Sequence, residues 1–277
     1  MNRIKSILIL CVALCFATSC KKDVDMTLVQ KTVLENADIR QIEVSDAWEV
    51  TVVADSNSYV ELEYSAYLEN NLKTRMEGTK LEIGFTGHVY PEINSVFRAT
   101  VHTPQLEIME ADDAAQVQCN GEFAGQHIKI ALSDASRCND LVFSGESCEI
   151  DMESASVMTG FQFVGSSCLA TLKDASQCNS AIAASESIQI HLSNASRLVN
   201  KGGTTNQVNT HLSDASLLNM VETEVKTMEV VLGGTSEATV HVTEMLSGTL
   251  KEFSTLYYKG NPQKDIDCSE GSRVIPF

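Results

Sequence analysis

The sequence has few aromatic residues and little proline, which limits the kind of core it can form. Aromatic residues make up 6% of the 277 residues, with Trp48 as the single tryptophan, and there are 4 prolines. Hydrophobic residues reach 43%, so a globular core can form. It must be filled mainly by aliphatic side chains, alanine, cysteine and methionine. Such side chains suit thin stacked β layers better than a β-sandwich whose core is filled by large aromatic rings.

Basic residues are also scarce. The chain has 20 Lys and Arg against 37 Asp and Glu, a formal net charge of −17. Removal of an N-terminal segment carrying Arg3 and Lys5 would give −17 − 2 = −19. Such a surface repels phosphate backbones, and no basic stripe interrupts it. Nucleic acid is therefore not an expected partner.

The common catalytic and metal-binding motifs are missing as well. The sequence contains no Gly-x-Ser-x-Gly elbow, His-Glu-x-x-His motif, phosphate loop, dinucleotide fingerprint or Cys-x-x-Cys pair. His191 and His211 share a repeat position and are expected to be exposed strand residues, because no third ligand accompanies them. We therefore predict no catalytic residue, metal ligand or cofactor, and we do not expect an enzyme.

The N-terminus has the features of an export signal. Residues 1–19 combine a short basic start, an apolar run from Ile7 to Phe16 that is too short to span a bilayer, and the small residues 17–19. Cys20 follows directly, an arrangement that resembles the lipobox of bacterial lipoproteins, in which this cysteine is acylated. The alternative is an ordinary cleaved signal followed by an unrelated cysteine.

The residues after Cys20 suggest where such a lipoprotein would be sorted. Lys21 and Lys22 follow the cysteine without an aspartate, which by resemblance to Gram-negative lipoproteins favours the outer membrane. The sequence does not choose between the cell surface and the periplasmic face. Residues 20–35 are polar and are expected to form a tether.

The most informative feature is a tripeptide close to Asp-Ala-Ser that returns every 20 residues. A related Asp-Ala-Ala lies one step of 21 residues earlier, and Ser254 falls in phase later. A fixed period in this range is typical of a solenoid. The successive tripeptides start at Asp134, Ser154, Asp174, Asn194, Asp214 and Gly234.

Alternating apolar residues flank each tripeptide, which predicts strands with one buried face. Three inward columns follow from the period, one of them through Leu132, Met152 and Leu172. Twenty residues cannot hold a strand and a crossover helix of normal length. Like strands must therefore stack on one another, which predicts an all-β, parallel β-helix, and the chirality of parallel crossovers favours the right-handed form. Looser returns are expected at residues 144–146 and 201–203.

The tripeptide itself is interpreted as a structural corner. Asp and Asn accept turn dihedrals and local hydrogen bonds, Ala was expected to point into a crowded corner, and Ser can bond the neighbouring coil. The alternative is a calcium-binding acidic column, although Ser and Asn interrupt it. The predicted corner ladder consists of Asp134, Ser136, Asp174, Ser176, Asn194, Ser196, Asp214 and Ser216.

Four cysteines fall on the inward columns. Cys148 and Cys168 occupy one column in adjacent coils, where a disulfide across the rung is one alternative. Buried free thiols are the favoured interpretation for them and for Cys138 and Cys178, because cysteine packs well as a small apolar residue.

The sequence divides into five segments. We expect a signal peptide at 1–19, a tether at 20–35 and a regular β-helix at 104–262. Residues 36–103 keep strand patterns without the clean period, so they are either irregular first coils or a cap. Residues 263–277 are expected to be a polar tail.

The order of several short motifs resembles a known family. The N-terminal half carries Ile42-Glu43-Val44-Ser45, Val-Glu-Leu-Glu at 60–63, Leu81-Glu82-Ile83 and Pro104-x-Leu106, and the C-terminal half closes with Tyr-x-Gly-x-Pro at 258–262. Over about residues 36–262 the chain is similar to the putative auto-transporter adhesins with a head GIN domain, although that family's turns usually read Ser-Gly-Ser. The resemblance implies a right-handed β-helix, an adhesive role and no catalytic residues.

Together these features predict a lipid-anchored cell-envelope β-solenoid that presents a repetitive surface to glycans or proteins. The alternatives are a structural envelope lipoprotein without a specific ligand and a polysaccharide-active β-helix enzyme. Nothing in the sequence specifies an oligomeric state.

Overall fold

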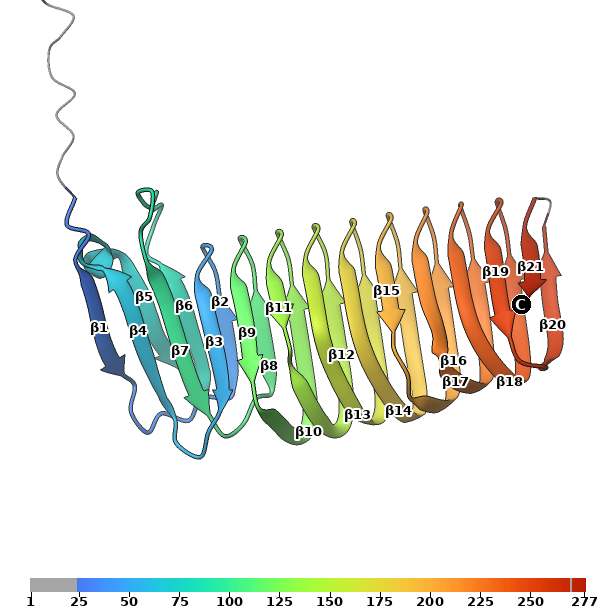
Figure 1. Ribbon diagram of the computed structural model, residues 1–277, viewed down its shortest axis with the longest axis horizontal. Helices are drawn as coiled ribbons and strands as arrows, with labels where there is room; N and C mark the ends of the chain where they lie inside the picture. Colours follow the sequence, from blue (N-terminus) through green and yellow to red (C-terminus); the bar gives the residue numbers. More distant parts are fainter. Residues whose placement is uncertain (1–23, 270) are drawn as a thin grey trace, which may run out of the picture.

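The computed structural model describes residues 24–269 and 271–277, so the predicted signal peptide and Cys20 lie outside the described residues. The chain is a parallel β-solenoid, an elongated stack of coils (Figure 1). The N-terminal strands are β1 (Leu28–Val33), β2 (Gln41–Val44), β3 (Glu49–Ala54), β4 (Tyr59–Ser65), β5 (Leu72–Glu77), β6 (Lys80–Phe85), β7 (Phe97–Thr103), β8 (Ile108–Ala111) and β9 (Gln116–Asn120).

The remaining strands form the regular coils. They are β10 (Glu122–Leu132), β11 (Arg137–Asn139), β12 (Val142–Met152), β13 (Val157–Leu172), β14 (Gln177–Leu192), β15 (Arg197–Asn200), β16 (Thr204–Leu212), β17 (Leu217–Leu232), β18 (Glu237–Leu250), β19 (Thr255–Lys259), β20 (Gln263–Cys268) and β21 (Arg273–Pro276). One 3₁₀ helix, η2, spans Ala66–Asn71. Within the described residues, no helix is long and apolar enough to cross a membrane.

Each coil rises to a sharp corner, descends, and bends round a broad lower edge (Figure 1). We call the strands that run toward the corners the ascending sheet; its hydrogen-bonded order is β5, β6, β2, β8, β10, β12, β13, β14, β16, β17, β18, β20. The descending sheet runs in the order β1, β4, β7, β3, β9, β11, β13, β14, β15, β17, β18, β19, β21. Long strands such as β13 belong to both sheets because they continue round the lower edge. Only the pairs β1–β4, β4–β7 and β5–β6 are antiparallel among the described strands.

The inward columns predicted from the period are confirmed. Leu132 pairs with Met152 and then Leu172, and Ile128 pairs with Cys148 and then Cys168, all of them buried. At the lower edge Phe143 stacks on Phe163 with ring centroids 6.4 Å apart. Apolar burial along these columns is the main stabilising contribution to the stack.

The N-terminal region contains both irregular coils and a cap. Strand β2 lies between β6 and β8, and β3 lies between β7 and β9, so two coils are stacked out of sequence order. Strands β1, β4 and β5 then extend the sheets with antiparallel pairings, and Leu68 of η2 is fully buried. This arrangement covers the end of the core and avoids an open stack of parallel edges.

Three expectations need correction. Residues 263–277 form a further coil rather than a tail, because β20 pairs with β18 and β21 with β19. Part of the expected tether is strand β1, which extends the sheet beside β4. Residues 144–146 lie inside β12 rather than in a loose return, although 201–203 do interrupt the strands.

Candidate functional site

The corner ladder was the first set of candidate residues. Asp134 and Ala135 have φ angles of 50° and 62°, and the Ser136 amide donates to the Ser133 carbonyl at 3.0 Å. These features define a tight turn of type I′, in which Asp and Asn accept left-handed dihedrals. Asp174, Asn194 and Asp214 adopt the same φ, between 53° and 54°.

The acidic side chains of this ladder are exposed. Asn194 Nδ2 donates to Asp174 Oδ1 at 2.7 Å, a contact between adjacent coils. No three His, Cys, Asp or Glu side chains within residues 24–269 and 271–277 are grouped in a way that could hold a metal ion. The geometry therefore favours the interpretation of the ladder as a structural corner.

The serine of the tripeptide is the buried member, and alanine is not. Ser136 is fully buried, and its Oγ donates to the Ala111 carbonyl of the preceding coil at 2.8 Å. Ser176 and Ser196 make equivalent bonds, each to a carbonyl of the coil that precedes its own. Ser216 instead bonds within its own turn. Ala135 is exposed, which corrects the expectation of an inward alanine: two successive left-handed residues turn its Cβ outward and the next side chain inward.

The cysteines on the inward columns are buried free thiols, as favoured. Cys148 and Cys168 pair in register without a disulfide. Burial raises the pKa of the Cys178 thiol to about 12, which removes the thiolate that nucleophilic or metal chemistry requires. His191 and His211 pair on the exposed face of the ascending sheet.

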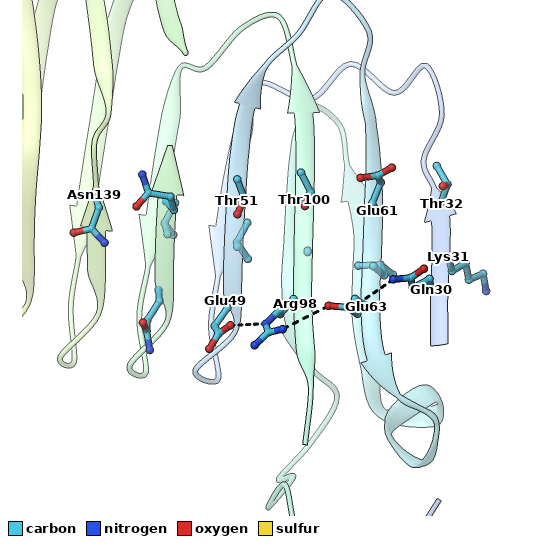
Figure 2. Close-up of a pocket in the computed structure, with 16 residues that line it drawn as sticks. Gln30, Lys31, Thr32, Glu49, Thr51, Glu61, Glu63, Arg98, Thr100 and Asn139 are labelled. Atoms are coloured by element: carbon cyan, nitrogen blue, oxygen red, sulfur yellow. Dashed lines mark hydrogen bonds and ion pairs between the residues drawn. The ribbon is translucent and has the colours of Figure 1, made fainter. Parts of the chain in front are cut away.

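A groove lies on the descending sheet of the N-terminal region. It has a volume of about 810 Å³ and lies across β1, β4, β7, β3, β9 and β11 (Figure 2). Alternation along the strands directs every second side chain outward into it. The outward side chains are Gln30, Thr32, Glu49, Thr51, Glu61, Glu63, Arg98, Thr100, Gln116, Gln118 and Asn139.

The shape of the groove follows from the sizes of its side chains. Thr51 and Thr100 pair at its centre, where their short side chains leave space. Longer glutamate, glutamine and arginine side chains surround them, while the apolar side chains of Leu62 and Ala99 are buried beneath. The result is a polar hollow whose outward side chains include no apolar one.

Arg98 organises the charges of the groove. Its Nε lies 2.6 Å from Glu49 Oε2, and its Nη1 lies 3.6 Å from Glu63 Oε2, as the dashed lines in Figure 2 show. Gln30 Nε2 donates to the other oxygen of Glu63 at 3.0 Å. The hydrogen bond to Glu49 raises the pKa of the Arg98 guanidinium above its usual value. With Glu61 included, the lining has three carboxylates against the two cations Arg98 and Lys31, so the groove carries a small net negative charge.

An aromatic pair adjoins the groove. Tyr59 and His102 stack with centroids 4.1 Å apart, two residues along their strands from Glu61 and Thr100 and on the same face. His102 Nδ1 lies 3.0 Å from Asp55 Oδ2. The hydrogen bonds from the Asn57 amide and from His102 lower the pKa of Asp55. This carboxylate thus fixes the orientation of the imidazole in the pair.

A second, smaller hollow of about 540 Å³ lies on the ascending sheet near the corners. It is strongly acidic, with Glu43, Glu110 and Asp151 around the small side chain of Ala131. At its edge, burial and the neighbouring Asp113 and Glu43 raise the pKa of Asp112 to about 6.

Sequence reasoning missed the groove because it depends on the pairing of strands that are far apart in the chain. Glu63 meets Arg98, and Arg98 meets Glu49, only because β7 lies between β4 and β3. A detectable signal was the Asp46-Ala47 dipeptide. Both residues have positive φ, which makes this a corner of the same kind and places a coil before residue 104.

The comparisons with known proteins agree with this architecture. Residues 38–262 match the family described as "Putative auto-transporter adhesin, head GIN domain". No curated protein matches the chain.

Several solved structures share the fold. A "putative adhesin" from Parabacteroides merdae is 13% identical with a TM-score of 0.61, over 91% of this chain and 96% of that one. A second "putative adhesin", from Parabacteroides distasonis, is 17% identical with a TM-score of 0.59, over 91% and 98%. A "putative lipid binding protein" from Parabacteroides distasonis is 15% identical with a TM-score of 0.62, over the same shares. At these identities the likeness is one of fold.

Proposed function

The chain belongs to the family of putative auto-transporter adhesins with a head GIN domain, and we propose that it is a lipid-anchored envelope adhesin whose groove on the descending sheet binds neutral oligosaccharides. The observation that carries this proposal is the composition of the groove. Its outward side chains are hydroxyl, amide, carboxylate and guanidinium groups on rigid strands.

These groups suit a ligand rich in hydroxyls. From fixed positions, amide side chains donate and accept hydrogen bonds and carboxylates accept them, so each can engage a sugar hydroxyl. The Tyr59–His102 pair beside Glu61 offers an aromatic surface for the apolar face of a sugar ring. Three carboxylates exceed the two cations of the lining, Arg98 and Lys31, and Arg98 is already paired with Glu49 and Glu63, which disfavours phosphorylated, sulfated or uronic-acid ligands.

A protein ligand fits the groove less well. Protein interfaces have a core of buried aromatic and aliphatic side chains, which act as the energetic centre of binding. The outward side chains of the groove are polar throughout, and the apolar residues of its strands point into the solenoid.

The anchor is proposed from the sequence. Cys20 follows a short apolar run and small residues, and acylation at this position would hold the protein to the outer membrane. Labelling of cells with a clickable palmitate analogue tests it: the mature chain should incorporate the label and the Cys20→Ser variant should not. Protease treatment of intact cells then distinguishes the cell surface from the periplasmic face.

The ligand is tested with a glycan array probed by the mature chain and two variants. Thr100→Trp fills the centre of the groove, and Thr239→Trp is the matched control, because Thr239 occupies the same row of the descending sheet in β18, at similar burial. We expect neutral glycans to bind the wild type and the control, and to lose binding to Thr100→Trp. A blank array across a broad panel, or equal binding by all three proteins, would contradict the proposal and favour an envelope spacer.

A further inference from the structure

The connection between β6 and β7 differs from every regular corner of the solenoid. Because β6 and β7 flank β2 and β3 in register, residues 86–96 occupy the position that the two-residue turn occupies in other coils. They form a projecting loop instead (Figure 1). Within this loop, Tyr90 and Ile93 are 89% and 87% exposed, the highest values among the exposed large hydrophobic residues of the described chain.

The base of this loop is fixed by hydrogen bonds. The Tyr67 hydroxyl accepts from the Glu92 amide at 2.8 Å and lies 2.6 Å from Ser95 Oγ. The Val96 amide donates to Ser65 Oγ at 3.0 Å. These bonds hold the segment on either side of Ile93, so the exposure of Ile93 is built into the loop rather than produced by fraying, and Tyr90 lies two residues before the bonded Glu92.

The same residues connect the loop to the N-terminal segment. The Tyr67 amide donates to the Asp25 carbonyl at 3.1 Å, and the Ala66 amide donates to the Thr27 carbonyl at 2.8 Å. Asp25 is five residues from Cys20, a distance of at most about 17 Å for an extended chain. An acyl group on Cys20 would therefore keep the loop close to the bilayer surface. Met26 and Leu28, exposed by 39% and 49%, lie beside these two contacts, with Leu28 as the first residue of β1.

We propose that Tyr90 and Ile93 insert into the lipid interface beside the anchor and hold the solenoid by its N-terminal end. The proposal rests on the acylation of Cys20 proposed above. Tyrosine is favoured at membrane interfaces, where its ring meets the acyl boundary and its hydroxyl stays hydrated. The acidic corners of the other coils are repelled by anionic headgroups, so the stack extends away from the bilayer and keeps the groove accessible.

Quenching by brominated lipids tests this contact. The acylated mature chain is reconstituted into vesicles of phosphatidylethanolamine with a minor share of phosphatidylglycerol, with and without bromine on the acyl chains. The indole introduced by Tyr90→Trp should lose about half of its emission or more in brominated vesicles, since an interfacial side chain lies about 5–10 Å deep. The wild type reports the contribution of Trp48, which is fully buried.

The matched control is Phe253→Trp. Phe253 is 71% exposed at the corner before β19, at the far end of the same edge. Its indole should not be quenched. Quenching of both indoles would overturn the end-on arrangement, and an unquenched indole at position 90 would overturn the insertion, as expected for a loop that serves a protein partner.

A second vesicle-binding experiment tests the loop contact independently of the acylation of Cys20. The Cys20→Ser chain is attached through an N-terminal hexahistidine segment to nickel-chelating lipids in the same vesicles. The double variant Tyr90→Ser/Ile93→Ser should dissociate about tenfold faster than its parent. Equal dissociation rates would reject the loop contact even where Cys20 is acylated in cells, and a tenfold difference would support it even where Cys20 is not.

Discussion

Removal of the Ser136 hydroxyl should destabilise the solenoid, whereas removal of the Ser156 hydroxyl should not. Both serines hold the third position of the corner tripeptide and both are fully buried. Ser136 Oγ donates to the Ala111 carbonyl at 2.8 Å, whereas Ser156 Oγ has no partner. The pair therefore isolates one hydrogen bond between coils in an otherwise constant environment.

The magnitudes follow from that difference. Ser136→Ala loses one intramolecular hydrogen bond, about 1 kcal/mol, and leaves no large cavity. The Ala111 carbonyl keeps its bond from the Ser133 amide at 3.0 Å, so no acceptor is left unpaired. Ser156→Ala removes a buried hydroxyl that has no bond, which should be neutral or stabilising by up to about 1 kcal/mol.

Urea unfolding of the two variants measures the effect, with the midpoint compared at constant slope. We expect a lower midpoint for Ser136→Ala and an unchanged or higher one for Ser156→Ala. Equal losses would show that the serine column acts through size and burial rather than through bonds between coils, and would refute the reasoning.

Three further predictions concern single residues. Asp112→Ser places at this corner position the serine found there in several other coils, and it should stabilise the protein at pH 7.5 by about 1 kcal/mol after allowance for solvent screening. The pKa of Asp112 is raised to about 6 in the folded protein, so its destabilising effect is complete above that pH and shrinks as the pH falls toward the ordinary value of 3.8; urea midpoints of wild type and variant should therefore converge near pH 4. Gly145→Ala should cost about 2 kcal/mol or more in the same assay, because its Cβ would clash with the Gly125 carbonyl oxygen. Gly125→Ala should cost much less, because the nearest neighbour of its Cβ is 3.4 Å away. Of the six described cysteines, only Cys268 should react rapidly with a maleimide in the native state, because the other five are buried and should be labelled only after unfolding. Peptide mapping of the labelled protein measures this.

The period predicted the regular coils because each of its positions has a fixed environment. Leu132, Cys148 and Met158 fall on buried columns at the expected spacing, and the structure confirms all three. Period-two alternation tells which residues face inward along a strand, and its parity continues across the corner. Counted in twos from Leu132, it makes Ser136 an inward position and Ala135 an outward one, as observed; only Asp134 departs from it, because its left-handed turn conformation leaves it exposed.

The first hundred residues were less predictable for a topological reason. Strand β2 pairs with β6 and β8, so its neighbours in space are not the next strands in sequence. No local pattern records this order, and the groove that depends on it could not be located. The exposed Tyr90 and Ile93 were equally hidden, because only the register of β6 and β7 shows that their loop replaces a corner.

The most direct test of the proposed function is a crystal structure of the mature chain with the strongest glycan from the array. The account predicts sugar density in the groove, with hydroxyls bonded to side chains of β4, β7 and β3, Glu63 and Arg98 among them. Density over the regular coils between β13 and β18, with an empty groove, would contradict it.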